Sequence, residues 1–158
     1  MVPSDLFTIP NQVRYFEDYV EGAVCTFGSV LVNQDEVIEF ASRFDPQVFH
    51  VDAVKAKDSH YGGLIASGWH TASMMMSQLA LYYLSDASSL GSPGLDNLRW
   101  LAPVRPGDTL HVRVTTTGTR RSTSKPGRGI VKSYIEVLNQ DDTVVMDINA
   151  ANFIACRP

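Results

Sequence analysis

The chain has 158 residues, a formal net charge of −4 at pH 7 and 44% hydrophobic residues. This size fits a single domain spanning residues 1–158, with enough apolar side chain for one sizeable core. The basic residues are spread out except in the stretch TRRSTSKPGRG (119–129), so the electrostatic footprint of a nucleic-acid-binding protein is missing.

Compartment and metal content are predicted from absences in the sequence. The first residues lack the pattern of a signal peptide, and no apolar run of 18 residues occurs, so we expect a cytoplasmic protein without membrane contact. The two cysteines, Cys25 and Cys156, lie near opposite ends of the chain. They define neither a disulfide framework nor a metal site.

The first half of the chain begins with a strand and a helix. Residues 23–32 (AVCTFGSVLV) are rich in β-branched side chains and predict a strand. Residues 33–44 predict a helix, with Asn33 as N-cap and apolar residues at helical spacing. We expect this helix to stop near Asp45, because Pro46 disfavours the α conformation of the residue before it.

A second helix is predicted for residues 68–84, GWHTASMMMSQLALYYL. This stretch has no charged residue and is apolar around nearly its whole circumference, which is typical of a helix inside a protein. At 1.5 Å per residue it would be about 25 Å long.

The remainder of the chain has the pattern of strands. Alternating or extended runs occupy 95–104, 108–119, 129–140 and 143–155, and NQDD at 139–142 indicates a hairpin turn. Alternation implies that one face of the sheet is covered, and the helix at 68–84 is the one segment large enough to cover it. The predicted fold class is therefore α+β, with a long central helix wrapped by a curved antiparallel sheet.

Asp45 and His50 are a candidate catalytic pair. On one continuous helix, residues five apart would lie about 140° from each other around the axis. A chain that turns after Pro46 could bring both side chains to one cavity, where they could share a water molecule as acid and base. The alternative is that they are two ordinary polar residues at a helix end.

Gly68 begins the buried helix. The first N–H groups of a helix have no intrahelical acceptor and lie at its positive end, so the Gly68 amide could stabilise negative charge on a substrate oxygen. Alternatively, the glycine lets the helix pack closely against the sheet.

Four stretches of the sequence resemble the MaoC-like dehydratases, relatives of the (R)-specific enoyl-CoA hydratases. They are FDPQVFHVD, YGGLIASGWHTASM, NLRWLAPVRPGDTL and STSKPGRGIVKSYIEVLNQDDTVVM, and the similarity covers residues 14–153. The resemblance implies a hotdog fold for the whole chain.

The resemblance also implies a reaction, the reversible hydration of a trans-2-enoyl-CoA to a (R)-3-hydroxyacyl-CoA. Asp45 and His50 match the family's acid and histidine, and Gly68 matches the glycine whose amide receives the thioester oxygen. No cofactor is implied beyond the coenzyme A of the substrate. The family's Asp-x-Asn-Pro-x-His motif is altered here, with Pro46 next to the acid and Gln47 in place of asparagine.

Four further residues are predicted to bind the substrate. Ser67 and Trp69 flank Gly68, and Trp69 in an acyl pocket would favour a short or branched chain. Lys125 and Arg128 of the basic stretch could contact the phosphates of coenzyme A. Arg99, Arg105, Arg120 or Arg121 could do the same, and the basic stretch could also be a solvated loop.

Alternative functions follow from the same residues. His50, Asp52, His60 and His70 are of ligand types that suit zinc, but their spacing matches no compact motif, and a serine hydrolase is disfavoured because G-x-S-x-G is missing. A thioesterase or a non-catalytic acyl-CoA-binding subunit would also fit a hotdog fold. Such a sheet leaves an exposed edge strand that needs covering, and the resemblance to the MaoC-like dehydratases implies a homodimer or a higher oligomer.

Overall fold

One antiparallel sheet of five strands forms the body of the protein. The computed structural model describes residues 4–158, with side chains from Leu6 onward. The strands are β1 (Val24–Leu31), β2 (Gly94–Trp100), β3 (Thr109–Arg121), β4 (Arg128–Leu138) and β5 (Val144–Ala155). Their order in the sheet is β1-β3-β4-β5-β2, so β1 and β2 form its two edges. All five predicted strands are present, and the turn at 139–142 joins β4 to β5.

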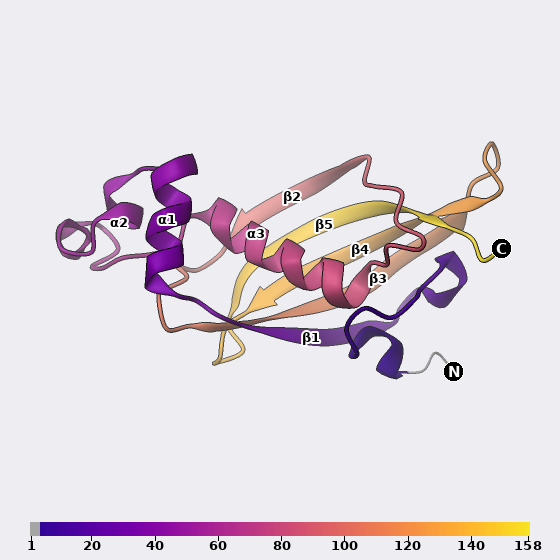
Figure 1. Cartoon of the computed structure of the whole chain (residues 1–158), viewed down its shortest axis with the longest axis horizontal. Coiled ribbons are helices and arrows are strands. Elements are labelled where there is room, and N and C mark those ends of the chain that lie inside the picture. Colours follow the sequence, from indigo (N-terminus) through magenta and orange to yellow (C-terminus); the bar gives the residue numbers. More distant parts are fainter. Residues whose placement is uncertain (1–3) are drawn as a thin grey trace.

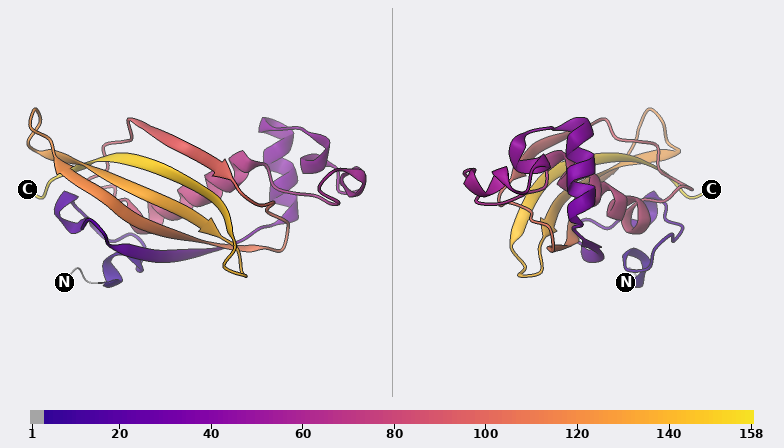
Figure 2. Two further views of the ribbon diagram at one scale, coloured as in Figure 1. Left: turned by 180° about the vertical axis from the view of Figure 1, so that it is seen from behind. Right: turned by 60° about the vertical axis from the view of Figure 1, so that its left-hand side comes forward.

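Helix α3 (Gly68–Gln78) lies along one face of the sheet, and the sheet curves around it (Figures 1 and 2). Val114, Ile135 and Ile148 face each other across β3, β4 and β5 and are buried. They pack in one cluster with Met75 and Leu79 of the helical segment. The predicted α+β architecture, with a helix wrapped by a curved antiparallel sheet, is confirmed.

The central helical segment differs from the prediction in two respects. The α-helix ends at Gln78, and Leu79–Tyr83 form a π-helical turn, η4. This turn leaves the Tyr83 hydroxyl 2.8 Å from Ser133 Oγ and 3.1 Å from Thr116 Oγ1 on the sheet. The segment is also not buried all round, because Trp69 is 56% exposed and Met76 is 44% exposed.

Two short helices lie at the N-terminal end of α3 (Figure 1). Helix α1 (Gln34–Phe44) begins as predicted at Asn33, whose side chain accepts the Glu36 N–H, and it ends at Asp45. Helix α2 (Val48–Val51) is a single turn that was not predicted, and the 3₁₀ helix η3 (Lys55–Asp58) follows it. These elements surround the beginning of α3.

The N-terminal arm packs at the other end of the molecule, near the C-terminus (Figure 1). It contains the 3₁₀ helices η1 (Ser4–Phe7) and η2 (Phe16–Asp18). Between them, the fully buried Arg14 donates to the carbonyl oxygens of Leu6, Ile9, Gln12 and Leu84. Arg14 therefore fixes the arm to the end of the central helical segment. In residues 4–158, no helix is both long and apolar enough to span a bilayer.

Candidate active site

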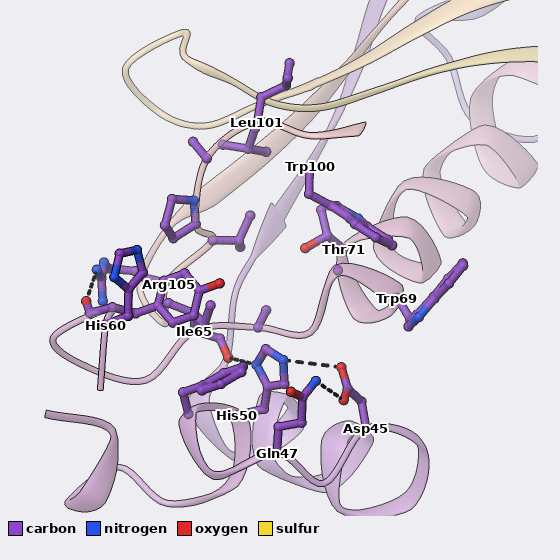
Figure 3. A pocket seen from close by; sticks show the side chains of 18 residues that line it. Asp45, Gln47, His50, His60, Ile65, Trp69, Thr71, Trp100, Leu101 and Arg105 are labelled. Carbon is purple, nitrogen blue, oxygen red and sulfur yellow. Dashed lines mark hydrogen bonds and ion pairs between the residues drawn. The ribbon is translucent and has the colours of Figure 1, made fainter. Parts of the chain in front are cut away.

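Asp45 and His50 meet at the junction of α1 and α2. Asp45 is the C-cap of α1, with φ −156° and ψ 67°, so the helix stops directly before Pro46. The chain then turns into α2, which carries His50. This turn places His50 Nε2 3.2 Å from Asp45 Oδ2 (Figure 3).

Both carboxylate oxygens of Asp45 accept hydrogen bonds. The Gln47 side-chain amide donates to Oδ1 at 2.7 Å, and the Ser67 hydroxyl donates to Oδ2 at 2.7 Å. Burial raises the pKa of the Asp45 carboxyl, but the bonds from Gln47 and Ser67 and the nearby His50 outweigh burial and hold the pKa below its ordinary value. Asp45 is therefore a fixed, ionised carboxylate at neutral pH.

His50 is held by a backbone carbonyl. Its Nδ1 lies 2.8 Å from the Ile65 carbonyl oxygen, and the Ile65 N–H donates to the Phe49 carbonyl at 3.0 Å. Because a carbonyl can only accept, Nδ1 carries a proton, and Nε2 is the nitrogen that faces Asp45. Nε2 can carry or release a proton, and it lies in direct contact with a carboxylate oxygen that can accept one. The pair can thus both give and take a proton.

Gly68 begins α3 beside this pair. Ser67 is the N-cap, and its Oγ accepts the Trp69 N–H at 3.2 Å while donating to Asp45. The Gly68 amide is among the first in the helix, where no intrahelical acceptor exists. A Cβ at Gly68 would lie 2.3 Å from the Trp100 ring. Gly68 therefore allows close packing, as the alternative interpretation holds, and it also places a backbone amide at the pocket.

A pocket of about 690 Å³ joins these groups. Asp45, Gln47, His50 and Gly68 line it, and Trp69 and Trp100, which meet edge to face at 5.1 Å, form one end. His60 and Arg105 lie at the other end (Figure 3). The remaining lining residues are Phe49, Tyr61, Ile65, Ala66, Thr71, Leu101, Ala102, Pro103, Val104 and Val145.

The other predicted substrate-binding residues have different positions. Trp69 lines the pocket. Ser67 does not, because it is fully buried and its hydroxyl is bonded to Asp45. Ser67 therefore contacts the acid, and the expectation that it contacts substrate directly is corrected.

Lys125 and Arg128 lie at or beside the tip of the β3–β4 hairpin, at the end of the sheet opposite α1 and α2 (Figure 1). The Arg128 guanidinium lies over the Phe153 ring at 4.3 Å. Neighbouring Arg121 pairs with Glu17 at 2.8 Å. The structure therefore does not support contact of Lys125 and Arg128 with a ligand in this chain's own pocket. The prediction failed because the order of charges along the sequence does not show at which end of the sheet these side chains lie.

The residues considered as zinc ligands do not gather. Within residues 4–158, no group of three or more His, Cys, Asp or Glu side chains is placed to hold a metal ion. Of those residues, His70 is buried and stacks on Phe40 at 4.8 Å, and Asp52 pairs with Lys55.

Sequence reasoning missed three contacts within the site. The contact of Ser67 with Asp45 spans 22 positions, and that of Trp100 with Gly68 spans 32, so no local pattern indicates either of them. Gln47 could have been found, because an amide two residues after a carboxylate can bond back to it across a turn.

Comparison with known proteins identifies the family of this chain. The family model described as MaoC like domain matches residues 16–137. Among solved structures, the chain is similar to a MaoC-like dehydratase from Rhodospirillum rubrum, with 37% identity and a TM-score of 0.85. That match covers 92% of this chain and 99% of the other.

Two more distant structures establish the fold alone. The R-hydratase PhaJ1 from Pseudomonas aeruginosa is 20% identical with a TM-score of 0.73, covering 95% of this chain and 89% of that one. Rv0216 from Mycobacterium tuberculosis, described as having a double hotdog fold, is 18% identical with a TM-score of 0.76, covering 92% of this chain and 45% of that one. The predicted hotdog fold is confirmed, and the chain belongs to the MaoC-like domain family.

Proposed function

We propose that this protein catalyses the reversible hydration of a trans-2-enoyl-CoA to a (R)-3-hydroxyacyl-CoA. The observation that carries the proposal is the 3.2 Å contact between Asp45 and His50 at the wall of a pocket that also contains Gly68. Water addition to an enoyl thioester needs an acid, a base and a donor to the thioester oxygen. These three groups are available in one cavity.

The proton transfers that this reaction needs can be assigned to Asp45 and His50. In hydration, the water oxygen bonds to C3 while one member of the pair takes a water proton. The other member gives its proton to C2, and the C2–C3 double bond becomes a single bond. The Gly68 N–H stabilises the negative charge that develops on the thioester oxygen. The pair takes one proton and gives one, so it ends with as many protons as it began with and can also catalyse dehydration.

The two tryptophans at one end of the pocket limit the size of the acyl group that can bind. Trp69 and Trp100 stand close to Gly68, where the thioester would bind. Two indole rings there leave little room for a long straight chain. We therefore extend the proposal to a short or branched acyl group, bound without any cofactor other than the coenzyme A of the substrate.

The assay uses crotonyl-CoA, a short trans-2-enoyl thioester. We expect the enoyl absorbance to fall without release of free thiol, and a (R)-3-hydroxybutyryl-CoA product. Release of free thiol would instead identify a thioesterase. Binding measured by calorimetry with neither change would identify a non-catalytic acyl-CoA-binding subunit, and either result would reject the proposal.

We also propose that the protein associates with a second copy of itself through strand β2. This edge strand pairs with β5 on one side, and its Leu95 and Trp100 are 57% and 46% exposed. An uncovered strand edge with large apolar side chains favours pairing with another edge. Sedimentation should give about twice the chain mass of 17.4 kDa, and the mass of a single chain would contradict this.

A further inference from the structure

The end of the pocket opposite the two tryptophans has a different chemical character. His60 and Arg105 line it (Figure 3). We propose that Arg105, with His60 beside it, forms a subsite for an anionic oxygen group of the ligand, either a phosphate or a carboxylate. This inference rests on the proposed function, because it takes the reacting thioester to lie between the two ends of the pocket.

Arg105 is fixed in place by the loop that precedes α3 and by Asp108 next to β3. Its Nη2 donates to the Tyr61 carbonyl at 2.6 Å, and its backbone N–H donates to Asp108 Oδ2 at 2.8 Å. A Cβ at Gly63 would lie 3.2 Å from Nη1, so the glycine makes room for the guanidinium. The side chain is thus preorganised at the pocket, which lowers the entropic cost of binding a ligand.

The charge of Arg105 is not neutralised by the protein. Among the described side chains, no carboxylate lies within ion-pair distance of its guanidinium. The neighbouring Asp108 uses Oδ2 for the Arg105 backbone N–H and Oδ1 for the Gln140 amide. Asp45, the acid that lines the pocket, is bonded to Gln47 and Ser67. The cationic group is therefore open to an external anion.

The donors that remain suit a planar or tetrahedral oxyanion. A guanidinium has five N–H donors in a fixed fork that matches phosphate and carboxylate, and the bond to Tyr61 uses one of them. His60, stacked edge-on against Tyr61 at 5.3 Å, adds an imidazole at the same end. A thioester ligand whose acyl chain points toward the tryptophans would bring the phosphates of its carrier to Arg105. One bound in the opposite direction would bring a carboxylate on its acyl chain there.

The test compares Arg105→Gln with Arg120→Gln, which removes the same charge from an exposed position near the tip of β3, at the far end of the sheet. Calorimetry measures binding of coenzyme A and of pantetheine, which lacks its phosphates. Steady-state kinetics compares crotonyl-CoA with 4-carboxybut-2-enoyl-CoA, which carries a terminal carboxylate. Thermal unfolding of each variant confirms that it is folded.

Each source of the anion gives its own result. If a carrier phosphate binds, Arg105→Gln should weaken coenzyme A binding about tenfold or more and leave pantetheine unchanged. If an acyl carboxylate binds, the variant should raise KM about tenfold for the carboxylated substrate and leave crotonyl-CoA and coenzyme A unchanged. Arg120→Gln should do neither.

Equal affinity of wild type and Arg105→Gln for all these ligands would overturn the subsite, whatever the catalytic activity. The calorimetric experiment does not need turnover. A protein that binds coenzyme A through Arg105 but hydrates no enoyl thioester would therefore support the subsite and contradict the proposed function.

Discussion

The two ends of the curved sheet use the same kinds of charged side chain differently. At the end that holds the N-terminal arm and the C-terminus, Arg14 is satisfied by four backbone carbonyls, and Arg121 and Arg157 pair with Glu17 and Asp18. At the other end, Asp45 and His50 face each other at a pocket wall, and the guanidinium of Arg105 has no carboxylate partner among the described side chains.

This difference separates structural charges from charges available for chemistry. Among the three arginines of the basic stretch 119–129, Arg121 contacts Glu17 and Phe16 of the N-terminal arm, and Arg128 lies over Phe153 of β5. Surface ion pairs of this kind contribute only about 0–1 kcal/mol each, whereas a fixed acid–base pair can change a rate by orders of magnitude. Substitutions at the two ends should therefore affect different observables.

The largest expected effect is on turnover after changes to the catalytic pair. Asp45→Asn or His50→Ala should lower hydration of crotonyl-CoA by about two to four orders of magnitude, because a positioned acid or base is removed. Initial rates from enoyl absorbance measure this. Both variants should keep a native circular dichroism spectrum, since Asp45 and His50 lie at the pocket rather than in the main apolar cluster.

Asp18→Asn is the matched control at the other end of the molecule. It removes a carboxylate that pairs with Arg157 at 2.8 Å and accepts the Tyr15 N–H. Turnover should be unchanged, with at most a small loss of stability. Wild-type rates in Asp45→Asn and His50→Ala would show that the pair is not catalytic.

The second effect is on stability at the end opposite the pocket. Arg14→Met keeps a long side chain but leaves four partly buried carbonyl acceptors without their donor. Hydrogen bonds to a charged group contribute about 1.5–3 kcal/mol each and do not add fully, so we expect the free energy of unfolding to fall by about 3 kcal/mol. Chemical denaturation measures it.

Below the unfolding transition, Arg14→Met should hydrate crotonyl-CoA at a near wild-type rate, because Arg14 lies away from the pocket lining. Val13→Ala is a useful control on the same arm, since Val13 is 59% exposed. A large loss of turnover in a folded Arg14→Met would contradict the separation of the two ends.

Most of the fold could be predicted because each element satisfies a local rule. The five strands follow from β-branched content, extended runs and alternation, and the end of α1 follows from Pro46. The π-helical turn at Leu79–Tyr83 could not be predicted, because it depends on Tyr83 reaching Thr116 and Ser133 on distant strands. Helix α2 is one turn long and has too few residues to show a period.

The site was predictable only where its parts are close in sequence. Asp45 and His50 are five positions apart, and a single turn decides whether they meet. The bond from Ser67 to Asp45 depends on how the loop before α3 packs against α1. The Trp100 ring reaches Gly68 only because β2 lies beside the start of α3. A sequence shows which residues are present but not where their side chains point in the folded chain.

The smallest of the three effects is a shift in pH dependence, and Ser67→Ala tests it. Burial raises the pKa of Asp45, and the hydrogen bonds from Gln47 and Ser67, together with His50, lower it to a net value below the ordinary 3.8. Removal of the Ser67 hydroxyl should move this pKa up toward its ordinary value. The acid limb of the rate profile should then move to higher pH, because activity is lost when the Asp45 carboxylate becomes protonated and can no longer accept a proton.

The same shift predicts a change in stability with a defined sign. A carboxyl with a lowered folded-state pKa stabilises the fold above its unfolded pKa, and this stability is lost as pH falls through the folded value. Ser67→Ala should therefore lose about 1.5–3 kcal/mol at neutral pH, from a bond to a charged group, and show a smaller further loss on acidification below about pH 4. Ser73→Ala, which removes an exposed hydroxyl from the same helix, should change neither property. An unmoved acid limb in Ser67→Ala would mean that Ser67 does not set the protonation of Asp45, and that the pocket end depends on Gln47 and His50 alone.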